Sequence, residues 1–278
     1  MGSPRSSVQS LLLTTATRAI LVELRHAARD AAAQSSVPYS NRPSGAAVLL
    51  SDGVVVPGAR VESASYSLVI PAVQNAITTA CAIGRLDIVA LAVDGPILAP
   101  FDIAYARAFL ARPRESGWAT VSDVFSEAHH LTVQASPWLP LPPVGNSPEQ
   151  PASGIELARS AAGHAHVPES DFPVACIAPS TEGYLCGVNV EHSDWTKTLC
   201  AERNLIGTTI SYGLGPPAAV YLSCLRDPTA SPCGACRQLL AEYFPETIIW
   251  QDRGTTAPDP ATPTELLPGF FSGDVLRR

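Results

Sequence analysis

The chain lacks an excess of positive charge and lacks long apolar runs, and each absence excludes a class of protein. Its 278 residues include 18 lysines and arginines against 25 aspartates and glutamates, which gives a formal net charge of −7. Affinity for nucleic acid depends largely on basic residues at phosphates, so this balance argues against a polynucleotide partner. No apolar stretch reaches the roughly 20 residues that a membrane-spanning helix needs. We therefore expect neither a nucleic acid nor a membrane as partner.

Residues 1–18 are expected to be a poor secretory signal, because they do not combine a basic start with a clean apolar core. They do contain serine, threonine and arginine, so a short organellar presequence stays open as an alternative. Seven cysteines in a chain without a secretory leader indicate reduced thiols and metal binding rather than disulfides. We expect a cytoplasmic protein.

Three of the cysteines lie in two short motifs, Cys200-Ala201-Glu202-Arg203 and Pro232-Cys233-Gly234-Ala235-Cys236-Arg237. Three thiolates can fill three corners of a zinc tetrahedron and leave the fourth open for water, which is the arrangement of a catalytic site. A glutamate beside the open corner is placed to move protons. Cys-x-Glu followed by Pro-Cys-x-x-Cys is typical of zinc-dependent deaminases. We expect one Zn²⁺ per chain, bound by Cys200, Cys233 and Cys236.

Each motif alone permits a simpler interpretation. A single C-x-x-C could be a redox pair or half of a structural zinc site. A closed structural site needs a fourth ligand, and neither candidate is convincing: Cys224 lies in an apolar run, and His192 stands well before Cys200. The cysteines outside the motifs have apolar neighbours, so we expect small core residues at Cys81, Cys176, Cys186 and Cys224.

The two motifs and their surroundings resemble the cytidine deaminases of pyrimidine salvage. The resemblance runs from about Asp171 to Phe271 and includes Phe172-Pro173-Val174-Ala175, Asn189-Val190-Glu191 and Leu267-Pro268-Gly269-Phe270-Phe271. Deoxycytidylate and tRNA adenosine deaminases have histidine as the first ligand, whereas cysteine there indicates the branch acting on free nucleosides. The resemblance implies an α/β fold with three α/β/α layers and a mixed sheet. It also implies hydrolytic deamination of cytidine and deoxycytidine to uridine and deoxyuridine, with release of ammonia.

Further roles follow from the same resemblance. Zinc-activated water attacks C4 of the pyrimidine, and Glu202 carries a proton to N3 and then to the leaving amino group. An arginine after this glutamate bonds the cysteine sulfurs, which assigns Arg203 to offset the negative charge of three thiolates on zinc. Arg237 is a second candidate for that role, or else an ordinary surface ion pair. The expected substrate contacts are Phe172, Asn189, Glu191, Ala201 and Phe271.

The individual substrate contacts rest on different grounds. Asn189 and Glu191 alternate along a strand end, so both can point at one ligand, where the family binds ribose hydroxyls. A free carboxylate at Glu191 would repel a phosphate and favour nucleosides. Phe172 resembles the aromatic residue packed on the pyrimidine, and Phe271 resembles one reaching into a neighbouring subunit's site. A turn asparagine, a solvated glutamate and two core phenylalanines are the alternatives. His192, Asp194 and Trp195 depart from the family pattern and leave the sugar-side preference open.

The first half of the chain repeats the second. Val61-Glu62 parallels Val190-Glu191, Pro71-Ala72-Val73-Gln74 lies over Cys200-Ala201-Glu202-Arg203, and Ala99–Ala104 lies over Ser231–Cys236. Every expected ligand position of the first copy is apolar, which predicts a filled pocket without zinc. We expect a degenerate, non-catalytic domain over 1–138, a proline-rich linker over 139–152 and the catalytic domain over 153–278. A chance likeness of two α/β units is the alternative.

Periodicity and turn residues predict the elements. We expect helices over 10–33, 72–83, 102–111, 153–163, 200–212 and 233–243, and strands over 45–50, 54–61, 88–93, 174–178, 184–190, 218–224 and 247–251. His129 and His130 are expected at the surface.

Single-domain relatives form tetramers, so two fused copies predict a homodimer of chains, a pseudo-tetramer of domains, acting on a small nucleoside. Two other functions stay open. One is deamination of a modified cytosine nucleoside or a polynucleotide, and the other is a non-catalytic interaction module stabilised by zinc.

Overall fold

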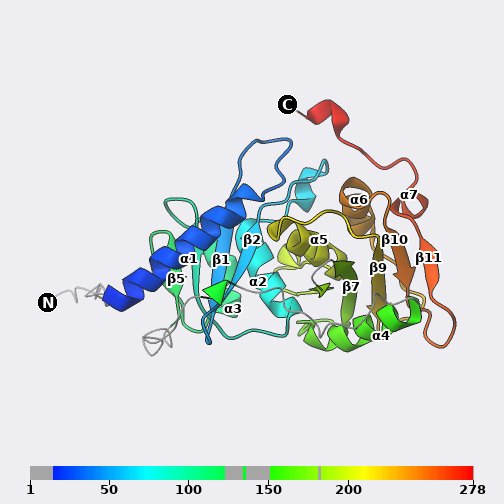
Figure 1. Cartoon of the computed structure of the whole chain (residues 1–278), viewed down its shortest axis with the longest axis horizontal. Coiled ribbons are helices and arrows are strands. Elements are labelled where there is room, and N and C mark those ends of the chain that lie inside the picture. The colour runs from blue at the N-terminus through cyan, green and yellow to red at the C-terminus, as the bar shows by residue number, and fades with distance from the viewer. Residues whose placement is uncertain (1–14, 123–133, 136–150, 181–182, 278) are drawn as a thin grey trace, which may run out of the picture.

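The computed structural model describes residues 15–122, 134–135, 151–180 and 183–277, which form two α/β units lying side by side (Figure 1). None of the described helices is long and apolar enough to cross a bilayer. The expected histidines His129 and His130 lie outside the described residues, as does the linker up to residue 150. Its last two residues are not linker, because they already form the first turn of a helix that begins at Pro151.

The first unit is a sheet with helices on both faces. Its strands follow the order β4-β5-β3-β1-β2-β6, and β1 is antiparallel to both β2 and β3. Helix α1 packs on one face, and α2, with α3 beside it, covers the other. The bounds are α1 Thr15–Ala33, β1 Gly45–Leu50, β2 Val54–Ala59, α2 Ala72–Ala82, β3 Ile88–Val93, α3 Pro100–Phe109, β4 Arg114–Ser116, β5 Ala119–Val121 and β6 Gln134–Ala135.

The second unit has the same three layers, with α4 on one face of its sheet and α5 on the other, beside α6. Strand order is β11-β10-β9-β7-β8, in which β9 and β10 are parallel and the other pairs are antiparallel. The expected mixed sheet is therefore confirmed. The bounds are α4 Pro151–Ala161, β7 Val174–Ser180, β8 Gly183–Val188, α5 Ala201–Ser211, β9 Ala219–Cys224, α6 Gly234–Tyr243, β10 Ile248–Gln251, β11 Asp259–Ala261 and α7 Pro263–Leu266.

Continuous apolar runs explain the layered core. Strands β1 and β3 are buried along their whole length, so side chains on both of their faces need a cover. Leu24 of α1 and Leu49 of β1 are fully buried in the cluster on one face, and Ile77 of α2 is fully buried on the other. The helices on the two faces of the sheet thus cover apolar side chains that the strands would otherwise expose to water.

The internal repeat is visible in equivalent hydrogen bonds. In the first unit Glu62 accepts hydrogen bonds from the backbone N–H groups of Tyr39 and Ser40 and from the Ser40 hydroxyl. Glu191 of the second unit accepts the corresponding bonds from Glu169 and Ser170. The isolated bridges Val61–Ile70 and Val190–Leu199 are also equivalent. The two halves therefore share their loops as well as their helices and strands.

The two units meet through α2 and α5 about a local pseudo-twofold axis. Thr79 and Thr208, which are equivalent residues, hydrogen-bond each other through their hydroxyls at 2.9 Å. Asn75 donates its amide to Ala59 O of its own unit and to Gly207 O of the other. Asn204 does the same in reverse, to Val188 O and Thr78 O. All four side chains are buried, and their hydrogen bonds between α2 and α5 fix how the units sit together.

A glycine in each unit brings the helix that follows onto the sheet. A Cβ at Gly187 of β8 would lie 2.2 Å from Ala201 O and 2.6 Å from Leu205 N. The equivalent Gly58 of β2 lies equally close to α2, where a Cβ would meet Ala72 O at 2.3 Å. Only glycine permits this approach. In the second unit, the close approach at Gly187 sets the position of the first turn of α5.

The units differ at the edge of the sheet beyond β3 and β9. In the second unit the strand after α6, β10, runs parallel to β9. In the first unit the strand after α3, β4, lies at the edge, and β5 takes the place beside β3 in the antiparallel direction. The short strands β4, β5, β6 and β11 and the helix α7 were not expected from the sequence, because two to four residues carry too little periodicity.

Candidate functional site

The cysteines of the two motifs lie where helices begin. Cys200 is the N-cap of α5 and Cys233 the N-cap of α6, while Cys236 lies in the first turn of α6. The free N–H groups of a helix start favour negative charge, so a thiolate is stabilised at each position. The predicted placement at helix starts is confirmed to within one residue.

The fold brings the three thiols into one cluster. Their Sγ atoms all lie within 4.8 Å of one another, and no other group of His, Cys, Asp or Glu in the described part of the chain is this close. Sγ of Cys233 lies 3.9 Å from Sγ of Cys200 and 3.5 Å from Sγ of Cys236. Tetrahedral zinc with Zn–S bonds of about 2.3 Å needs sulfurs about 3.8 Å apart. The donor set therefore fits Zn²⁺.

Glu202 lies directly beside this cluster. Its carboxylate Oε2 is 3.2 Å from Sγ of Cys236, and the side chain is 4% exposed. Burial raises the pKa of Glu202 above its ordinary value. A carboxyl group with a raised pKa exchanges protons more readily near neutral pH than an exposed one does. The site thus combines a metal-binding triad with a group suited to proton transfer.

The thiols share protons unevenly. Hydrogen bonds from Cys200 and Cys236, with the N–H groups of the α6 start, lower the pKa of Cys233 to about 2. The hydrogen bond that Cys200 donates to Cys233 raises the pKa of Cys200 to about 12. The same sharing, together with burial, raises the pKa of Cys236. These hydrogen bonds favour the thiolate at Cys233, and the thiolate is the form that binds a metal.

A cavity of about 190 Å³ opens onto the triad. Three of the expected substrate contacts line it: Phe172, which precedes β7; Asn189, which follows β8; and Ala201, at the start of α5. The Asn189 amide accepts a hydrogen bond from Val174 N at 2.8 Å and donates one to Phe172 O at 2.9 Å, which holds the cavity wall in place. The sequence predicted that Phe172, Asn189 and Ala201 share one site, and in the structure all three line the same cavity.

Glu191 does not line this cavity, and its carboxylate is not free. It is 3% exposed and accepts bonds from Glu169 N, Ser170 N and the Ser170 hydroxyl. Burial acts to raise the pKa of Glu191, but these hydrogen bonds outweigh it and the pKa is lowered. The carboxylate that was expected to be free is therefore engaged by the 169–170 turn, whose hydrogen bonds stabilise its charged form.

Phe271 also lies away from the cavity of its own chain. Half of it is exposed, and its carbonyl accepts a hydrogen bond from Gln238 Nε2 at 2.8 Å. The tail that follows continues onto the first unit, where a Cβ on Gly273 would lie 2.5 Å from Cβ of Ala64. Phe271 therefore serves a substrate site only if another chain brings one to it.

Neither arginine of the motifs hydrogen-bonds a cysteine sulfur. Arg203 donates to Leu68 O of the first unit at 3.2 Å. Arg237 donates to Pro232 O at 2.6 Å, to the Ser231 hydroxyl at 2.7 Å and to Leu266 O at 3.2 Å. The sulfur contacts expected of Arg203 are absent from the described hydrogen bonds, because its guanidinium reaches across to the other unit. Among the residues that the structure describes, the partners of Arg237 are two carbonyls and a hydroxyl, and no ion pair of Arg237 is found there.

Asp252, which was not expected at the site, lines the same cavity. It is 8% exposed and accepts two hydrogen bonds from Arg159, at 2.7 and 2.6 Å, and one from the Ser223 hydroxyl at 2.7 Å. Burial acts to raise the pKa of Asp252, but these bonds outweigh it and lower the pKa. An acidic residue directly after a buried strand was the available signal, since the carboxyl ends of parallel strands border ligand sites.

His192 and Trp195, which depart from the family pattern, lie outside the triad. The His192 ring stacks on Tyr105 of the first unit at 5.4 Å, and its Nδ1 accepts a hydrogen bond from Asp194 N at 2.9 Å. Trp195 is 64% exposed. His192 is therefore a contact between the units and not a metal ligand in this fold.

The first unit presents no thiol at the equivalent positions. Pro71 is the N-cap of α2, as Cys200 is of α5, and Val73 is buried where Glu202 would stand. Phe101, equivalent to Cys233, stacks on Tyr105 at 6.4 Å, and the Tyr105 side chain is fully buried. Apolar and aromatic side chains thus stand where the second unit has two of its clustered thiols and the buried carboxyl group.

Comparison with known proteins gives the family of both halves. The cytidine and deoxycytidylate deaminase zinc-binding region matches residues 148–251, and a second model with the same description matches residues 5–93. A cytidine deaminase of Halalkalibacterium halodurans is 43% identical over 124 residues, which are 44% of this chain and 94% of that protein.

Two further proteins are similar over a comparable length. A probable cytidine deaminase of Dictyostelium discoideum is 36% identical over 126 residues, which are 44% of this chain and 84% of that protein. The crystal structure of cytidine deaminase from Mycobacterium tuberculosis covers 43% of this chain and 95% of its own, with 33% identity and a TM-score of 0.38. Each of these relatives thus matches less than half of this chain.

Proposed function

Because the chain belongs to the cytidine deaminase family of zinc-dependent hydrolases, we propose that its second unit deaminates cytidine and deoxycytidine hydrolytically to uridine and deoxyuridine. Ammonia is the second product. The observation that supports this assignment most strongly is the meeting of three thiols and one buried carboxyl group at a single cavity. In this proposal Cys200, Cys233 and Cys236 bind the zinc and Glu202 is the catalytic residue.

Zinc in this triad would supply a water molecule of lowered pKa, and hence a nucleophile at neutral pH. Glu202 accepts the proton of that water on its carboxylate and returns it to N3 of the pyrimidine. The carboxylate then takes a second proton, from the hydroxyl group now at C4, and delivers it to the amino group, which leaves as ammonia while the C4 oxygen becomes the carbonyl of the product. Its burial supports this role, because a raised pKa keeps the protonated form accessible during turnover.

The cavity wall positions the substrate. Phe172 offers a ring to the face of the pyrimidine, and Ala201 offers backbone between the metal ligand and Glu202. Asn189 faces the same cavity and is available to a sugar hydroxyl only by sharing its amide with Val174 and Phe172. Glu191 acts behind this wall: its carboxylate fixes the 169–170 turn that leads to Phe172.

We propose that the first unit, residues 1–138, is a structural partner without zinc. Its apolar residues at the ligand-equivalent positions support this, as does the polar interface that joins it to α5. The second unit, residues 153–278 in this proposal, would then carry the only catalytic zinc, one per chain.

The assembly we propose is a homodimer of chains in the cytoplasm, acting on small nucleosides of pyrimidine salvage. A half-exposed Phe271 supports it, because that ring lacks a cavity in its own chain. The net charge of −7 supports a nucleoside rather than a nucleic acid as substrate. Light scattering of the purified protein should give twice the chain mass of 29.2 kDa, and a fully active monomer would refute the dimer.

The experiment that tests the function measures zinc per chain by elemental analysis and, on the same sample, the fall in ultraviolet absorbance as cytidine becomes uridine. About one zinc with turnover is expected, and Cys233→Ser should lose both. The matched control is Cys224→Ser, which changes a thiol at the same cavity but outside the triad. Zinc without turnover on either nucleoside would contradict the substrate assignment while leaving the metal site intact.

A further inference from the structure

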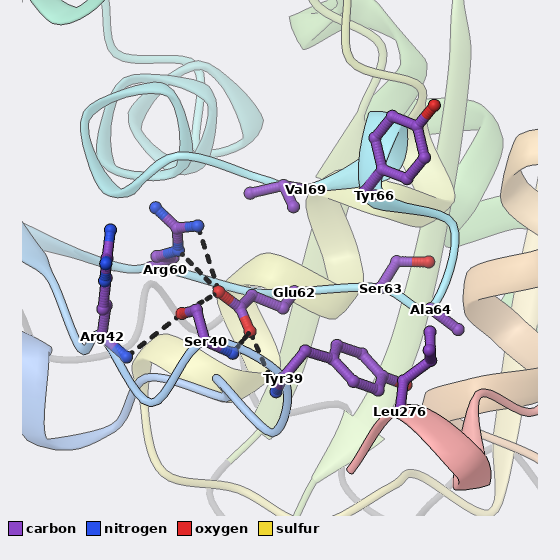
Figure 2. Close-up of a pocket in the computed structure, with 10 residues that line it drawn as sticks. All are labelled: Tyr39, Ser40, Arg42, Arg60, Glu62, Ser63, Ala64, Tyr66, Val69 and Leu276. Carbon is purple, nitrogen blue, oxygen red and sulfur yellow. Dashed lines mark hydrogen bonds and ion pairs between the residues drawn. The ribbon is translucent and has the colours of Figure 1, made fainter. Parts of the chain in front are cut away.

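A second pocket, in the first unit, has walls that correspond to part of the catalytic cavity. It has a volume of about 430 Å³ and is lined by Tyr39, Ser40, Arg42, Arg60, Glu62, Ser63, Ala64, Tyr66, Val69 and Leu276 (Figure 2). In the internal repeat, Arg42 corresponds to Phe172 and Arg60 to Asn189, both of which line the catalytic cavity. Two neutral positions at a ligand cavity are thus both arginine here, in a chain with an excess of acidic residues.

The two arginines differ in how many hydrogen-bond and ion-pair partners their guanidinium groups already have. Arg60 pairs with Glu62, through Nη2 at 3.0 Å and Nε at 3.2 Å, and keeps Nη1 for another acceptor. Arg42 is exposed, and among the described residues its guanidinium has no hydrogen-bond or ion-pair partner. Figure 2 shows both guanidinium groups on the same side of the pocket. One unpaired and one partly used guanidinium suit an anion with several acceptor oxygens.

The acidic residue of the pocket does not oppose this. The Glu62 side chain is 4% exposed and accepts hydrogen bonds from Tyr39 N, Ser40 N and the Ser40 hydroxyl as well as from Arg60. Its oxygens are therefore occupied by protein donors, including the cationic Arg60, before a ligand arrives. What remains at the pocket surface on this side is the positive charge of Arg42.

The rest of the pocket is held in place from the second unit. Glu242 of α6 accepts hydrogen bonds from the Ser63 hydroxyl at 2.7 Å and from Ala64 N at 2.9 Å. Gly273 of the C-terminal tail packs on Ala64 and Tyr39, and Leu276 completes the wall. A wall fixed from both units costs little further ordering when a ligand binds.

From these features we propose that the first unit binds a phosphate-bearing small molecule, with its phosphate at Arg42 and Arg60. The volume exceeds what a free phosphate needs and lies within the usual range for organic ligands. Tyr66, on the other side of the pocket in Figure 2, offers an aromatic ring to the organic part. This site is separate from the metal triad and does not depend on the deaminase reaction.

The test is calorimetric titration of the zinc-loaded full chain with uridine 5′-monophosphate and, separately, with inorganic phosphate. Saturating uridine in both titrations fills the catalytic cavity, so that only the second pocket is observed. About one site per chain is expected. Tighter binding of the nucleotide would identify an organic phosphate, whereas equal binding would identify phosphate itself, and either supports the site.

Variants separate the pocket from general charge effects. Arg42→Ala should weaken binding at least about fivefold, and Arg42→Phe with Arg60→Asn, which restores the residues of the second unit, at least about tenfold. Arg42→Lys should retain part of the affinity. Arg107→Ala removes an exposed arginine of the same unit outside the pocket and should leave binding unchanged. Because Arg42 makes no described side-chain contact, its variants should keep the melting temperature.

Two results would overturn the proposal. One is the absence of saturable binding of either probe to the wild-type chain up to about 10 mM, which is weaker than a paired guanidinium site should allow. The other is binding that Arg42→Ala and the double variant leave unchanged.

Discussion

Arg237 should act on zinc by holding the loop that carries Cys233, and its substitution tests this directly. Its guanidinium donates to Pro232 O, the Ser231 hydroxyl and Leu266 O, which lie on both sides of the start of α6. Arg237→Ala leaves two carbonyls and a hydroxyl without this donor. The segment before Cys233 is then no longer linked to α7 through Arg237. The Cys233 thiol is therefore no longer held in place before zinc binds.

The size of the effect follows from the number and kind of these contacts. Loss of a residue that orients a metal ligand costs about 10- to 100-fold in metal affinity. At about 1.4 kcal/mol per tenfold change, this corresponds to about 1.4–2.8 kcal/mol. Three hydrogen bonds from a charged donor could contribute more, but Ser231 is exposed and water replaces part of that loss. We expect an effect within this range.

Arg237→Lys separates two explanations. If Arg237 acted only by offsetting the charge of the thiolates, lysine would restore zinc affinity. If it acts by tying three acceptors together, lysine should remain close to alanine, because an ammonium group lacks the planar fork. Competition with a chromophoric chelator measures the affinity of each variant. Arg226→Ala, which removes a surface partner of Asp171, is the matched control. Wild-type zinc affinity in Arg237→Ala would refute the positioning role.

Three further predictions concern catalysis, acid stability and the contact between the units. Glu202→Gln should lower kcat/KM for cytidine at least about 10²- to 10⁴-fold while zinc content stays at the wild-type level, because the amide cannot transfer protons; a variant with wild-type turnover would contradict the mechanism. Because the pKa of Asp252 is lowered in the folded chain, its ion pair with Arg159 stabilises the fold fully above the unfolded pKa of about 4 and progressively less as pH falls below it. Urea midpoints at pH 6 and pH 3 should therefore differ less in Asp252→Asn than in the wild type, and an equal difference would exclude this contribution. Thr79→Val should cost about 1–3 kcal/mol of unfolding free energy by leaving the Thr208 hydroxyl without its partner, whereas Thr79→Val with Thr208→Val should recover much of it; additive losses would refute the direct contact.

The sequence alone determined the longer helices and strands and the residue types of the site. Strands β1, β3 and β9 and the helix starts at Cys200 and Cys233 follow within a residue from apolar runs and motif spacing. These features are local, because a run of apolar residues or a thiol at a helix start acts through its immediate neighbours. The triad and Glu202 could be grouped because Cys-x-Glu followed by Pro-Cys-x-x-Cys is a combined motif typical of zinc-dependent deaminases.

The tertiary structure decided which polar groups are still available once the chain has folded. Glu191 has the right type and spacing for a ligand contact, but the 169–170 turn uses its carboxylate. Arg237 follows a metal ligand, yet it bonds the loop and α7 instead of sulfur. Asp252 enters the cavity only because β10 pairs beside β9. Each outcome depends on donors and acceptors distant in sequence.

The internal repeat shows the same division. The repeat and the absence of thiols at the equivalent positions of the first copy can both be predicted from the amino-acid sequence. That Thr79 meets Thr208, and that Arg42 and Arg60 share a pocket with the C-terminal Leu276, depends on how two units pack about a common axis. These contacts join residues that are far apart in the sequence, so local sequence patterns do not predict them.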